Sequence, residues 1–481
     1  MNFSLNLLGP ELVFLLLALT LFLASMLEPQ KPALARRLVG LCPVAALASA
    51  VWALAACPTG ADMFFGGYRV DRLSQFFKIL ISLGFLATYL NARRQKTVTE
   101  DQKPDYFMFL SLSSFGLVVL ASAAELAAIY LAMELSSYSL YVLIPARTRS
   151  KAAAEAGLKY ILFGAAATAL ALYGLAFIIA SQHHTQLGAL AGLDWRLATN
   201  PLAVTGLTLF MGGLFFKLAL FPFHFWCPDV YQGAGNETAA YVATLPKLGA
   251  IVVLIRLAQF LVPGEALTNL LAVLAAASVT YGNLCALAQK DLKRMLGFSS
   301  VAHAGYILVG LVAGTPEGLA AAAFYAMAYL LMNLLCFWII ARLSPDGRNL
   351  VYEDLNGLST RSPSLALCLL ASAFSLVSLP PTVGFIGKLW LITSAWGHGY
   401  DWLVIVVCVN SAIAIFYYLS LVRHAYAEET PGRTVETAVD LSFLSRAGAL
   451  IMAILVLLLG VLPGPVWSLV LAASRSLWPA A

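Results

Sequence analysis

The chain has 481 residues, of which 61% are hydrophobic and 11% are charged, and its formal net charge is +5. Soluble domains carry roughly 45–50% apolar and about 25% charged residues, so this composition excludes a soluble protein. The small net charge gives no reason to expect nucleic acid as a partner. Apolar runs of the ~20 residues that span a bilayer fill nearly the whole sequence, which predicts an all-α polytopic membrane protein.

In chain order, the apolar runs predict about fourteen transmembrane helices. Because Met1 to Asn6 carry no positive side chain, we expect the first run to be kept as a span rather than cleaved as a signal peptide. The predicted spans are 7–27, 38–57, 70–91, 105–121, 123–145, 156–181, 202–228, 237–261, 266–288, 297–314, 317–343, 362–396, 402–425 and 446–471.

The seventh and twelfth predicted spans are each interrupted by proline. Pro222 donates no backbone hydrogen bond and its ring crowds the carbonyl of Leu218, while Pro380-Pro381 interrupt the twelfth span. Inside a membrane the freed carbonyls must find partners in protein or water. Lys217 precedes one break and Lys388 follows the other. Broken helices with ionisable side chains mark ion sites in transporters; a kinked core helix, with the lysine reaching a headgroup, is the alternative.

The positive charges predict an orientation. Most lysine and arginine residues lie in loops that follow odd-numbered spans, such as the loop with Lys290 and Arg294. Cytoplasmic loops are rich in these residues, so both chain ends are expected on the non-cytoplasmic side. The two broken spans then run in opposite directions, which predicts two inverted five-helix repeats, spans four to eight and nine to thirteen. The expected units are N-terminal helices 1–104, repeats 105–261 and 266–425, and a C-terminal loop and helix 426–481.

Several ionisable side chains are predicted deep inside the membrane. Glu134 lies about eleven residues into span five, roughly 16 Å deep at ~1.5 Å per residue. An isolated carboxylate at that depth is costly, so we expect Glu134 to pair with Lys217. A purely structural ion pair is the alternative. The candidate site residues are Glu134, Lys217, Lys247, Lys388, His224 and His303.

The remaining candidates have more ordinary alternatives. Lys247 is central in span eight and follows Pro246, which frees another carbonyl. His224 and His303 each lie on an apolar helix, where a satisfied core histidine is the alternative to a functional one. Lys159 is expected at the interface, and Arg256 is expected to face lipid or to anchor its helix.

The ionisable residues indicate ion movement rather than bond-making chemistry. A desolvated lysine can release and regain a proton, so a line of buried lysines suits a proton relay. The seven cysteines form no C-x-x-C pair and are expected to be small core residues. No Gly-rich nucleotide loop follows a strand pattern, so we expect no cofactor site in this chain.

The motifs together resemble the antiporter-like membrane subunits of respiratory complex I over spans four to thirteen. The carrying motifs are Met133-Glu134-Leu135, Phe216-Lys217 with Pro222, His224 and Trp226, Pro228 to Ala234, Ala243-Thr244-Leu245-Pro246-Lys247, Gln289 to Leu296 leading into His303, and Gly384-Phe385-Ile386-Gly387-Lys388. Within this family, the lysine that ends the last motif favours the subunit type that has lysine at this position over the type that has glutamate. Because the chain ends soon after the last span, it does not resemble the type that carries a long lateral helix. The usual Ala-Pro-Thr-Pro-Val reads here Ala234-Gly235-Asn236-Glu237-Thr238, so Glu237 is expected to cap that helix instead.

The resemblance implies a proton-translocating subunit of the bacterial inner membrane. It implies that NADH, FMN, iron–sulfur clusters and quinone are bound by other subunits of the complex, including neighbours of similar fold, and that this chain has no redox cofactor. A subunit of an Mrp-type Na⁺/H⁺ antiporter, which shares the fold, is the alternative. A substrate-carrying secondary transporter would need polar specificity groups at the breaks, and these are scarce.

Overall fold

The computed structural model describes residues 5–57, 60–147, 150–428 and 443–477. Within these ranges, twelve helices are long and apolar enough to cross a membrane, or thirteen if one bent pair is counted as a span. The predicted twelfth span appears as two shorter apolar helices, Pro363–Val377 and Val383–Ala395. The expectation of an all-α polytopic membrane protein is therefore confirmed.

The chain begins with a helical unit that carries a small hairpin. Its helices are α1 (Gly9–Leu27), α2 (Pro32–Val39), α3 (Cys42–Ala56) and α4 (Arg72–Ala92). The strands β1 (Ala61–Met63) and β2 (Tyr68–Val70) pair antiparallel before α4, with Asp62 opposite Arg69. Asp71 starts α4 with a capping box, since its side chain accepts from the Ser74 backbone and the Ser74 hydroxyl accepts from Asp71.

Two similar groups of helices follow. The first holds α5 (Lys103–Ser122), α6 (Leu126–Leu143), α7 (Lys151–Gln182), the short α8 (Leu187–Leu190), α9 (Pro201–Leu218), α10 (Trp226–Gly233) and α11 (Asn236–Leu257). The second holds α12 (Ala266–Leu287), α13 (Leu292–Val312), α14 (Pro316–Leu343), the short α15 (Leu358–Arg361), α16 (Pro363–Val377), α17 (Val383–Ala395) and α18 (Asp401–Ala425). Short 3₁₀ turns lie at Leu5–Leu8, Phe64–Gly66, Ile144–Ala146, Ala258–Phe260 and Tyr352–Leu355.

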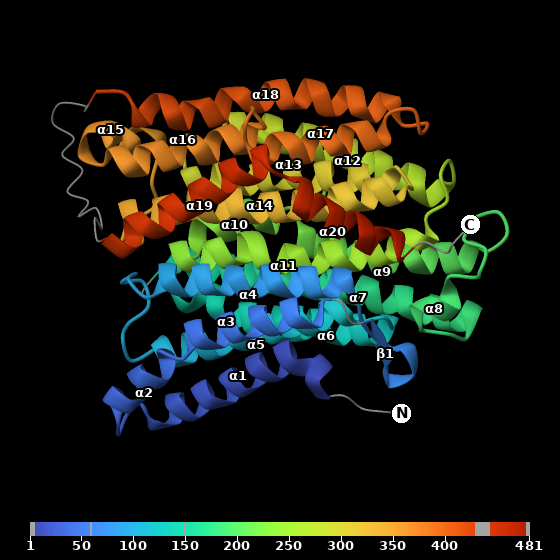
Figure 1. Ribbon diagram of the computed structural model, residues 1–481, viewed down its shortest axis with the longest axis horizontal. Coiled ribbons are helices and arrows are strands. Elements are labelled where there is room, and N and C mark those ends of the chain that lie inside the picture. The colour runs from blue at the N-terminus through green and yellow to red at the C-terminus, as the bar shows by residue number, and fades with distance from the viewer. Residues whose placement is uncertain (1–4, 58–59, 148–149, 429–442, 478–481) are drawn as a thin grey trace.

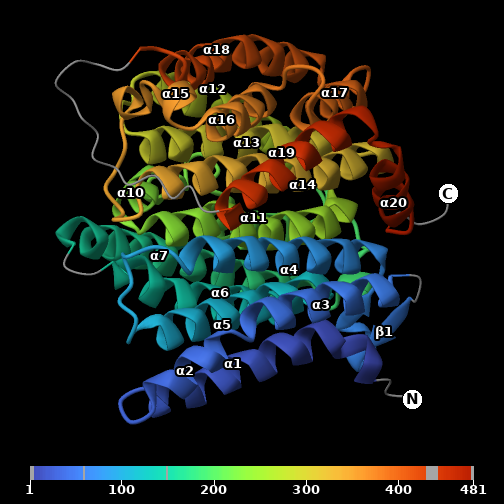
Figure 2. The ribbon, with the colours of Figure 1, turned by 60° about the vertical axis from the view of Figure 1, so that its left-hand side comes forward.

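The long helices run side by side in a single bundle (Figure 1, Figure 2). The N-terminal helices form one edge and α18 the other, while α11 and α14 lie between them and pack on each other. Every residue of α11 is buried. The start of α1, the end of α20 (Gly464–Arg475) and the hairpin lie at the same end of the bundle (Figure 1).

The last predicted span, 446–471, is a bent pair of helices rather than one continuous helix. The chain instead forms α19 (Phe443–Val461) and α20, and their axes are bent by 72°. The physical reason is Pro463 followed by Gly464 and Pro465, since proline lacks the amide that a continuing helix needs.

The two proline breaks have the same backbone form. α9 ends at Leu218, where Ala219 adopts a left-handed conformation with φ of 60° and the Leu220 amide bonds the carbonyl of Phe215 at 2.9 Å. α16 ends at Val377, where Ser378 has φ of 76° and the next amide bonds the carbonyl of Phe374 at 2.9 Å. A cis proline peptide follows each break, before Pro222 and before Pro381. This equivalence is what the predicted repeat of two broken helices requires.

A second equivalence lies in how the first two helices of each group pack. A Cβ atom added at Gly116 of α5 would lie 2.8 Å from the backbone nitrogen of Ser136 on α6. A Cβ atom at Gly282 of α12 would lie 2.6 Å from the backbone nitrogen of Ala302 on α13. Both contacts are closer than any Cβ tolerates, so glycine is what allows each pair of helices to touch backbone to backbone.

We predict that Gly282→Ala destabilises the bundle by about 1–3 kcal/mol, because the added methyl group must push α12 away from α13. The measurement is thermal unfolding of the purified membrane complex. Gly188→Ala in α8 is the matched control, since no atom lies within 4 Å of a Cβ at Gly188. Equal unfolding temperatures for the two variants would contradict the close contact.

Candidate functional site

The break after α9 is completed by a lysine from the central helix α11. The Lys247 ammonium donates to the carbonyl oxygen of Leu218 at 2.9 Å and also to the hydroxyl of Ser300 on α13. Lys247 is 1% exposed. The carbonyl that the sequence predicts to be freed beside Pro222 therefore finds its partner in the protein, and that partner is one of the candidate residues.

The break after α16 is completed in a similar way. The Lys388 ammonium lies 3.5 Å from the carbonyl oxygen of Val377, the last residue of α16, and 4.2 Å from the centre of the Tyr306 ring. Lys388 is buried. Each broken helix thus presents its final carbonyl to a lysine ammonium, and the two lysines come from different helices.

Lys217 and Glu134 lie near each other but do not form the expected direct ion pair. The Lys217 ammonium donates to the carbonyl of Met133 at 2.6 Å and to the hydroxyl of Ser137 at 3.0 Å. The Glu134 carboxylate accepts from Thr168 of α7 at 2.7 Å rather than from Lys217. Residues 133 and 137 share one face of α6 while residue 134 points to the next face, which explains the separation. The Glu134 charge still acts on Lys217 through space.

His303 lies between Lys247 and Lys388, and both of its ring nitrogens have partners. Nδ1 lies 2.8 Å from the hydroxyl of Tyr325, and Nε2 lies 3.0 Å from the hydroxyl of Tyr418. The ring also packs edge-on against Tyr306, over which Lys388 sits. Both lysines act electrostatically on the imidazole. Lys247, His303 and Lys388 therefore lie in one polar region, while a line through all the candidate residues stays a prediction.

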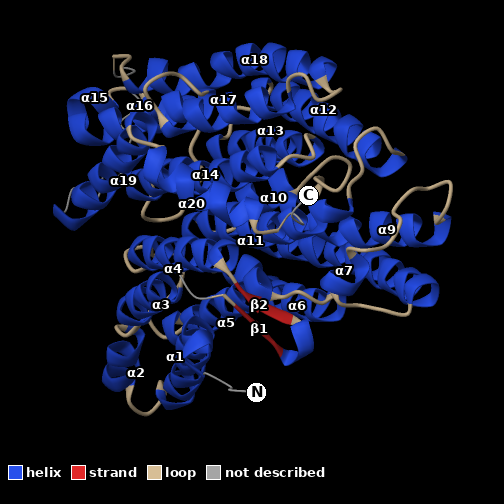
Figure 3. Ribbon diagram, turned by 45° about the vertical axis from the view of Figure 1, so that its right-hand side comes forward, coloured by secondary structure: helices blue, strands red, loops and turns tan. Residues whose placement is uncertain are grey.

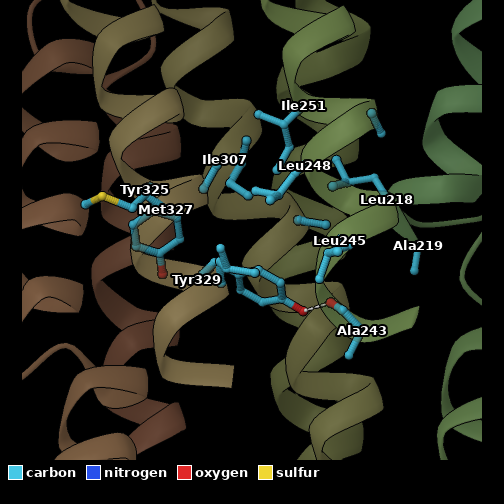
Figure 4. Close-up of a cluster of buried hydrophobic side chains, with 14 of the residues drawn as sticks. Leu218, Ala219, Ala243, Leu245, Leu248, Ile251, Ile307, Tyr325, Met327 and Tyr329 are labelled. Carbon is cyan, nitrogen blue, oxygen red and sulfur yellow. Dashed lines mark hydrogen bonds between the residues drawn. The ribbon is translucent and has the colours of Figure 1, made fainter. Parts of the chain in front are cut away.

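Hydroxyl groups bond to these candidates in two sets, one at Lys247 and one at His303. Ser300, which contacts Lys247, is 2.7 Å from the hydroxyl of Tyr329 on α14. The Tyr329 hydroxyl donates in turn to the carbonyl of Ala243 at 3.0 Å, the dashed line in Figure 4. Ser299 pairs with the Tyr418 hydroxyl at 2.6 Å. Apolar side chains such as Leu245 and Leu248 surround Tyr329 in the same view (Figure 4), so the hydroxyls form a narrow polar thread in an apolar core.

His224 does not join this thread. Its ring stacks on Phe221 and packs against Tyr281, and neither ring nitrogen has a hydrogen-bond partner within the described part of the chain. It lines a cavity of about 310 Å³ together with Lys159, Asp229, Arg294 and several aromatic rings. Lys159 binds Asp229 at 2.7 Å and Arg294 binds the same carboxylate, so the expected interfacial place of Lys159 fits an ion-paired, partly exposed side chain.

The expected cap by Glu237 is wrong, and of the two roles expected for Arg256 the structure supports the helix anchor. Arg256 neither faces lipid nor snorkels: it is 3% exposed and donates to both carboxylate oxygens of Asp71, at 2.9 and 3.0 Å. Glu237 lies in the first turn of α11 but makes no side-chain cap, because its carboxylate accepts from Thr97 at 2.5 Å. Both side chains turn into the protein because their partners lie there, the Asp71 carboxylate for Arg256 and the Thr97 hydroxyl for Glu237.

The sequence analysis did not identify the serine and tyrosine hydroxyls beside the candidate residues. It also did not identify a buried ion pair other than Arg256–Asp71. Ser299 and Ser300, adjacent polar residues inside an apolar span, were an available signal for the hydroxyl thread. This other buried ion pair joins the Lys78 ammonium to the Glu11 carboxylate at 2.5 Å. All seven cysteines are free, four of them buried. Among the described residues, no group of three or more His, Cys, Asp and Glu side chains is placed to hold a metal ion.

Comparisons with known proteins agree with this geometry. Residues 123–414 match the family described as NADH:quinone oxidoreductase/Mrp antiporter, membrane part. "NADH-quinone oxidoreductase subunit N 2" of Solidesulfovibrio magneticus is 54% identical over 98% of both chains. A chain of respiratory complex I from Thermus thermophilus is 33% identical, covers 95% of this chain and 98% of its own length, and superimposes with a TM-score of 0.81.

A more distant likeness shows the fold alone. A chain of the Mrp complex from Dietzia superimposes with a TM-score of 0.83 at 21% identity, covering 99% of this chain and 98% of its own. The family match spans both helix breaks and the candidate residues between them, and the relative from Solidesulfovibrio extends it to nearly the full length. The chain therefore belongs to the family of membrane subunits that NADH:quinone oxidoreductases share with Mrp antiporters.

Proposed function

We propose that this chain is subunit N of a proton-translocating NADH:quinone oxidoreductase, respiratory complex I. The observation that carries the proposal is the pair of buried lysines, each at the last carbonyl of a broken helix. The His303 ring lies between them, in contact with the ring of Tyr329 on one side and the ring of Tyr306 on the other. The subunit name of the 54% identical relative supports the assignment to subunit N. The Mrp-type antiporter subunit remains the alternative function, supported only by the shared fold.

In the proposed relay, Glu134, Lys217, Lys247, His303 and Lys388 hold and pass protons. Lysine fits this task because its ammonium can give up a proton when desolvated, whereas the carbonyls of Leu218 and Val377 stabilise the charged form. Ser300 touches Lys247 and can accept and donate at the same oxygen. His303, with a hydroxyl on each nitrogen, is the proposed bridge between the two lysines.

Glu134 and His224 have distinct proposed roles. Glu134 adds a negative charge next to the helical turn that binds Lys217, so removing that charge would change how readily Lys217 holds its proton. His224 has no bond to the line, and its proposed role is proton exchange between the cavity beside Asp229 and the break at Pro222.

The proposal extends to partners, cofactors and location. Many large apolar side chains are exposed along the outer helices, Leu16, Val44 and Leu162 among them, which suits a chain surrounded by lipid and by other membrane subunits. We propose that NADH, FMN, iron–sulfur clusters and quinone are bound by those other subunits and that this chain binds none of them. The proposed location is the bacterial inner membrane, with both ends on the non-cytoplasmic side.

The proposed units of the chain follow the sequence boundaries. Residues 1–104 form the N-terminal helices, 105–261 and 266–425 the two inverted repeats, and 426–481 the C-terminal loop and helix. The proposed equivalence of the two repeats, 105–261 and 266–425, is supported by the two matching helix breaks and by the matching glycine contacts at Gly116 and Gly282. Part of the last unit, residues 429–442, lies outside the described residues.

The orientation predicts where added cysteines react. Lys290→Cys, in an exposed position before α13, is expected to react with an impermeant maleimide only from the cytoplasmic side. Arg196→Cys, exposed in the loop before α9, is expected to react only from the other side. The background carries Cys408→Ser, because Cys408 is the exposed native cysteine among the seven. Labelling of the two positions from the reverse sides would overturn the orientation.

The proposed role of Glu134 predicts a graded effect. Glu134→Ala is expected to slow proton-coupled turnover by about tenfold, which corresponds to about 1.4 kcal/mol in a barrier. Glu134→Asp keeps the negative charge, so its proton-coupled turnover is expected to fall much less than that of Glu134→Ala. The measurement is proton uptake together with quinone reduction in proteoliposomes that hold the whole complex. A matching loss of assembled complex in both variants would instead make Glu134 a structural residue.

The lysine relay is tested by charge-preserving substitutions. Arginine keeps the charge but does not release its proton in proteins, so Lys247→Arg and Lys388→Arg are expected to assemble and yet lose proton transfer by roughly 10²-fold. Lys247→Met and Lys388→Met are expected to lose it as well. Arg36→Lys, in the exposed helix α2, is the matched control. Full proton translocation per electron in Lys388→Arg would remove Lys388 from the relay, and in both arginine variants it would reject the proposed mechanism.

A further inference from the structure

A second cluster of buried charges lies between the N-terminal helices and α11. Lys78 of α4 is fully buried and pairs with Glu11 of α1 at 2.5 Å. Tyr68 of the hairpin, drawn red in Figure 3, donates its hydroxyl to Glu11 and receives a hydrogen bond from Lys78 at 3.4 Å. The Asp71–Arg256 pair lies beside them, and its charges act on Lys78. The relay proposed above uses none of these residues.

The cluster belongs to a polar face that runs along α4. Asp71, Gln75, Lys78 and Ser82 are spaced so that they fall on one side of a helix. Over eleven residues this face extends roughly 16 Å, about half of the hydrocarbon thickness. At its inner end the Ser82 hydroxyl pairs with Ser49 at 2.9 Å. The polar face therefore runs from the hairpin end of the bundle towards its middle.

The opposite side of α4 packs on α11, the helix that carries Lys247. Gly84, two residues beyond Ser82, packs on Leu245 of α11 so closely that a Cβ there would lie 2.8 Å from its Cδ1. Leu245 is two residues before Lys247. Two residues turn a helix by about 200°, so this contact is on the side of α4 opposite its polar face, at nearly the level of Lys247.

Polar atoms of the cluster lack protein partners although they are buried. Both amide atoms of Gln75 and one carboxylate oxygen of Glu11 have no hydrogen-bond partner among the described residues. Buried polar groups of native proteins are nearly always bonded, and small internal waters are the usual partner where protein supplies none. Burial, and next the charge of Glu11, raise the pKa of Tyr68 well above its ordinary value, so Tyr68 keeps its proton and remains a donor.

We propose that Glu11, Lys78, Tyr68 and Gln75 form a hydrated proton-exchange site that serves the hairpin end of the bundle. In the exchange, the Lys78 ammonium transfers a proton to the Glu11 carboxylate, which releases it to water. The neutral amine regains a proton from the interior side, so charge and atoms balance over the cycle. A buried ion pair contributes little net stability compared with apolar residues of the same size, which is why a structural role alone does not account for it.

The inference rests on the proposed function in two respects: the chain translocates protons, and both chain ends lie on the non-cytoplasmic side. With both chain ends on the non-cytoplasmic side, the hairpin end is the side of release, because the start of α1 and the end of α20 lie there as well (Figure 1). The site is a further step beyond the lysine relay, on a face of α4 that the relay does not use.

The test uses the whole complex in proteoliposomes with Gln75→Leu as its first variant. Leucine fills the same buried space without the unpartnered amide, so a purely structural role predicts normal assembly and normal translocation. The hydrated site predicts normal assembly with fewer protons translocated per electron. Asp62→Asn with Arg69→Gln, which removes an exposed ion pair of the same hairpin, is the control and is expected to change nothing.

The second variant is the charge-neutral double substitution Glu11→Gln with Lys78→Met. We expect it to lower the proton-to-electron ratio and to abolish any infrared carbonyl band of a protonated Glu11 that appears during turnover. An unchanged ratio in Gln75→Leu overturns the inference, even if the double variant fails to assemble. If Lys247→Met lowers translocation while Gln75→Leu does not, the relay stands and only this site is rejected.

Discussion

In the apolar interior of this bundle, the carbonyl at the end of a broken helix has no neighbour in its own helix to bond. The ammonium of Lys247 supplies the missing donor for Leu218, and the freed carbonyl in turn stabilises a charge that the membrane would otherwise exclude. Each group makes the burial of the other tolerable. Hydroxyls such as Ser300 can then gather around the ammonium without themselves being left unsatisfied.

The same solution appears twice because the fold contains the same break twice. A left-handed residue, Ala219 or Ser378, ends the helix, and a lysine reaches the last carbonyl. At the first break the lysine comes from α11, a different span, and at the second from α17, the other half of the same broken span. The partners differ in detail, since Lys388 lies over the ring of Tyr306 while Lys247 contacts a serine hydroxyl. The two lysines occupy different positions in the two repeats, so the breaks reach a similar electrostatic arrangement from different helices.

The sequence was sufficient for those features that depend on local chemistry. Proline at Pro222 and Pro380-Pro381 located both breaks, and apolar length located nearly all spans. Features that depend on which helix face meets which could not be predicted, because a span that is apolar all round gives no facing direction. The carboxylate of Glu134 therefore bonds Thr168 rather than Lys217, and Arg256 bonds Asp71 rather than reaching lipid.

The placement of His303 between two tyrosine hydroxyls has a consequence for the timing of a relay. A neutral imidazole is a donor on one nitrogen and an acceptor on the other, so the hydroxyls of Tyr325 and Tyr418 must point in opposite senses around it. When a proton enters on one nitrogen and another leaves from the opposite one, the ring tautomer and both hydroxyls end reversed. In such a relay, a second proton could not move in the same direction until the imidazole tautomer and both hydroxyls had returned to their first orientation. This reorientation would set a minimum interval between successive protons.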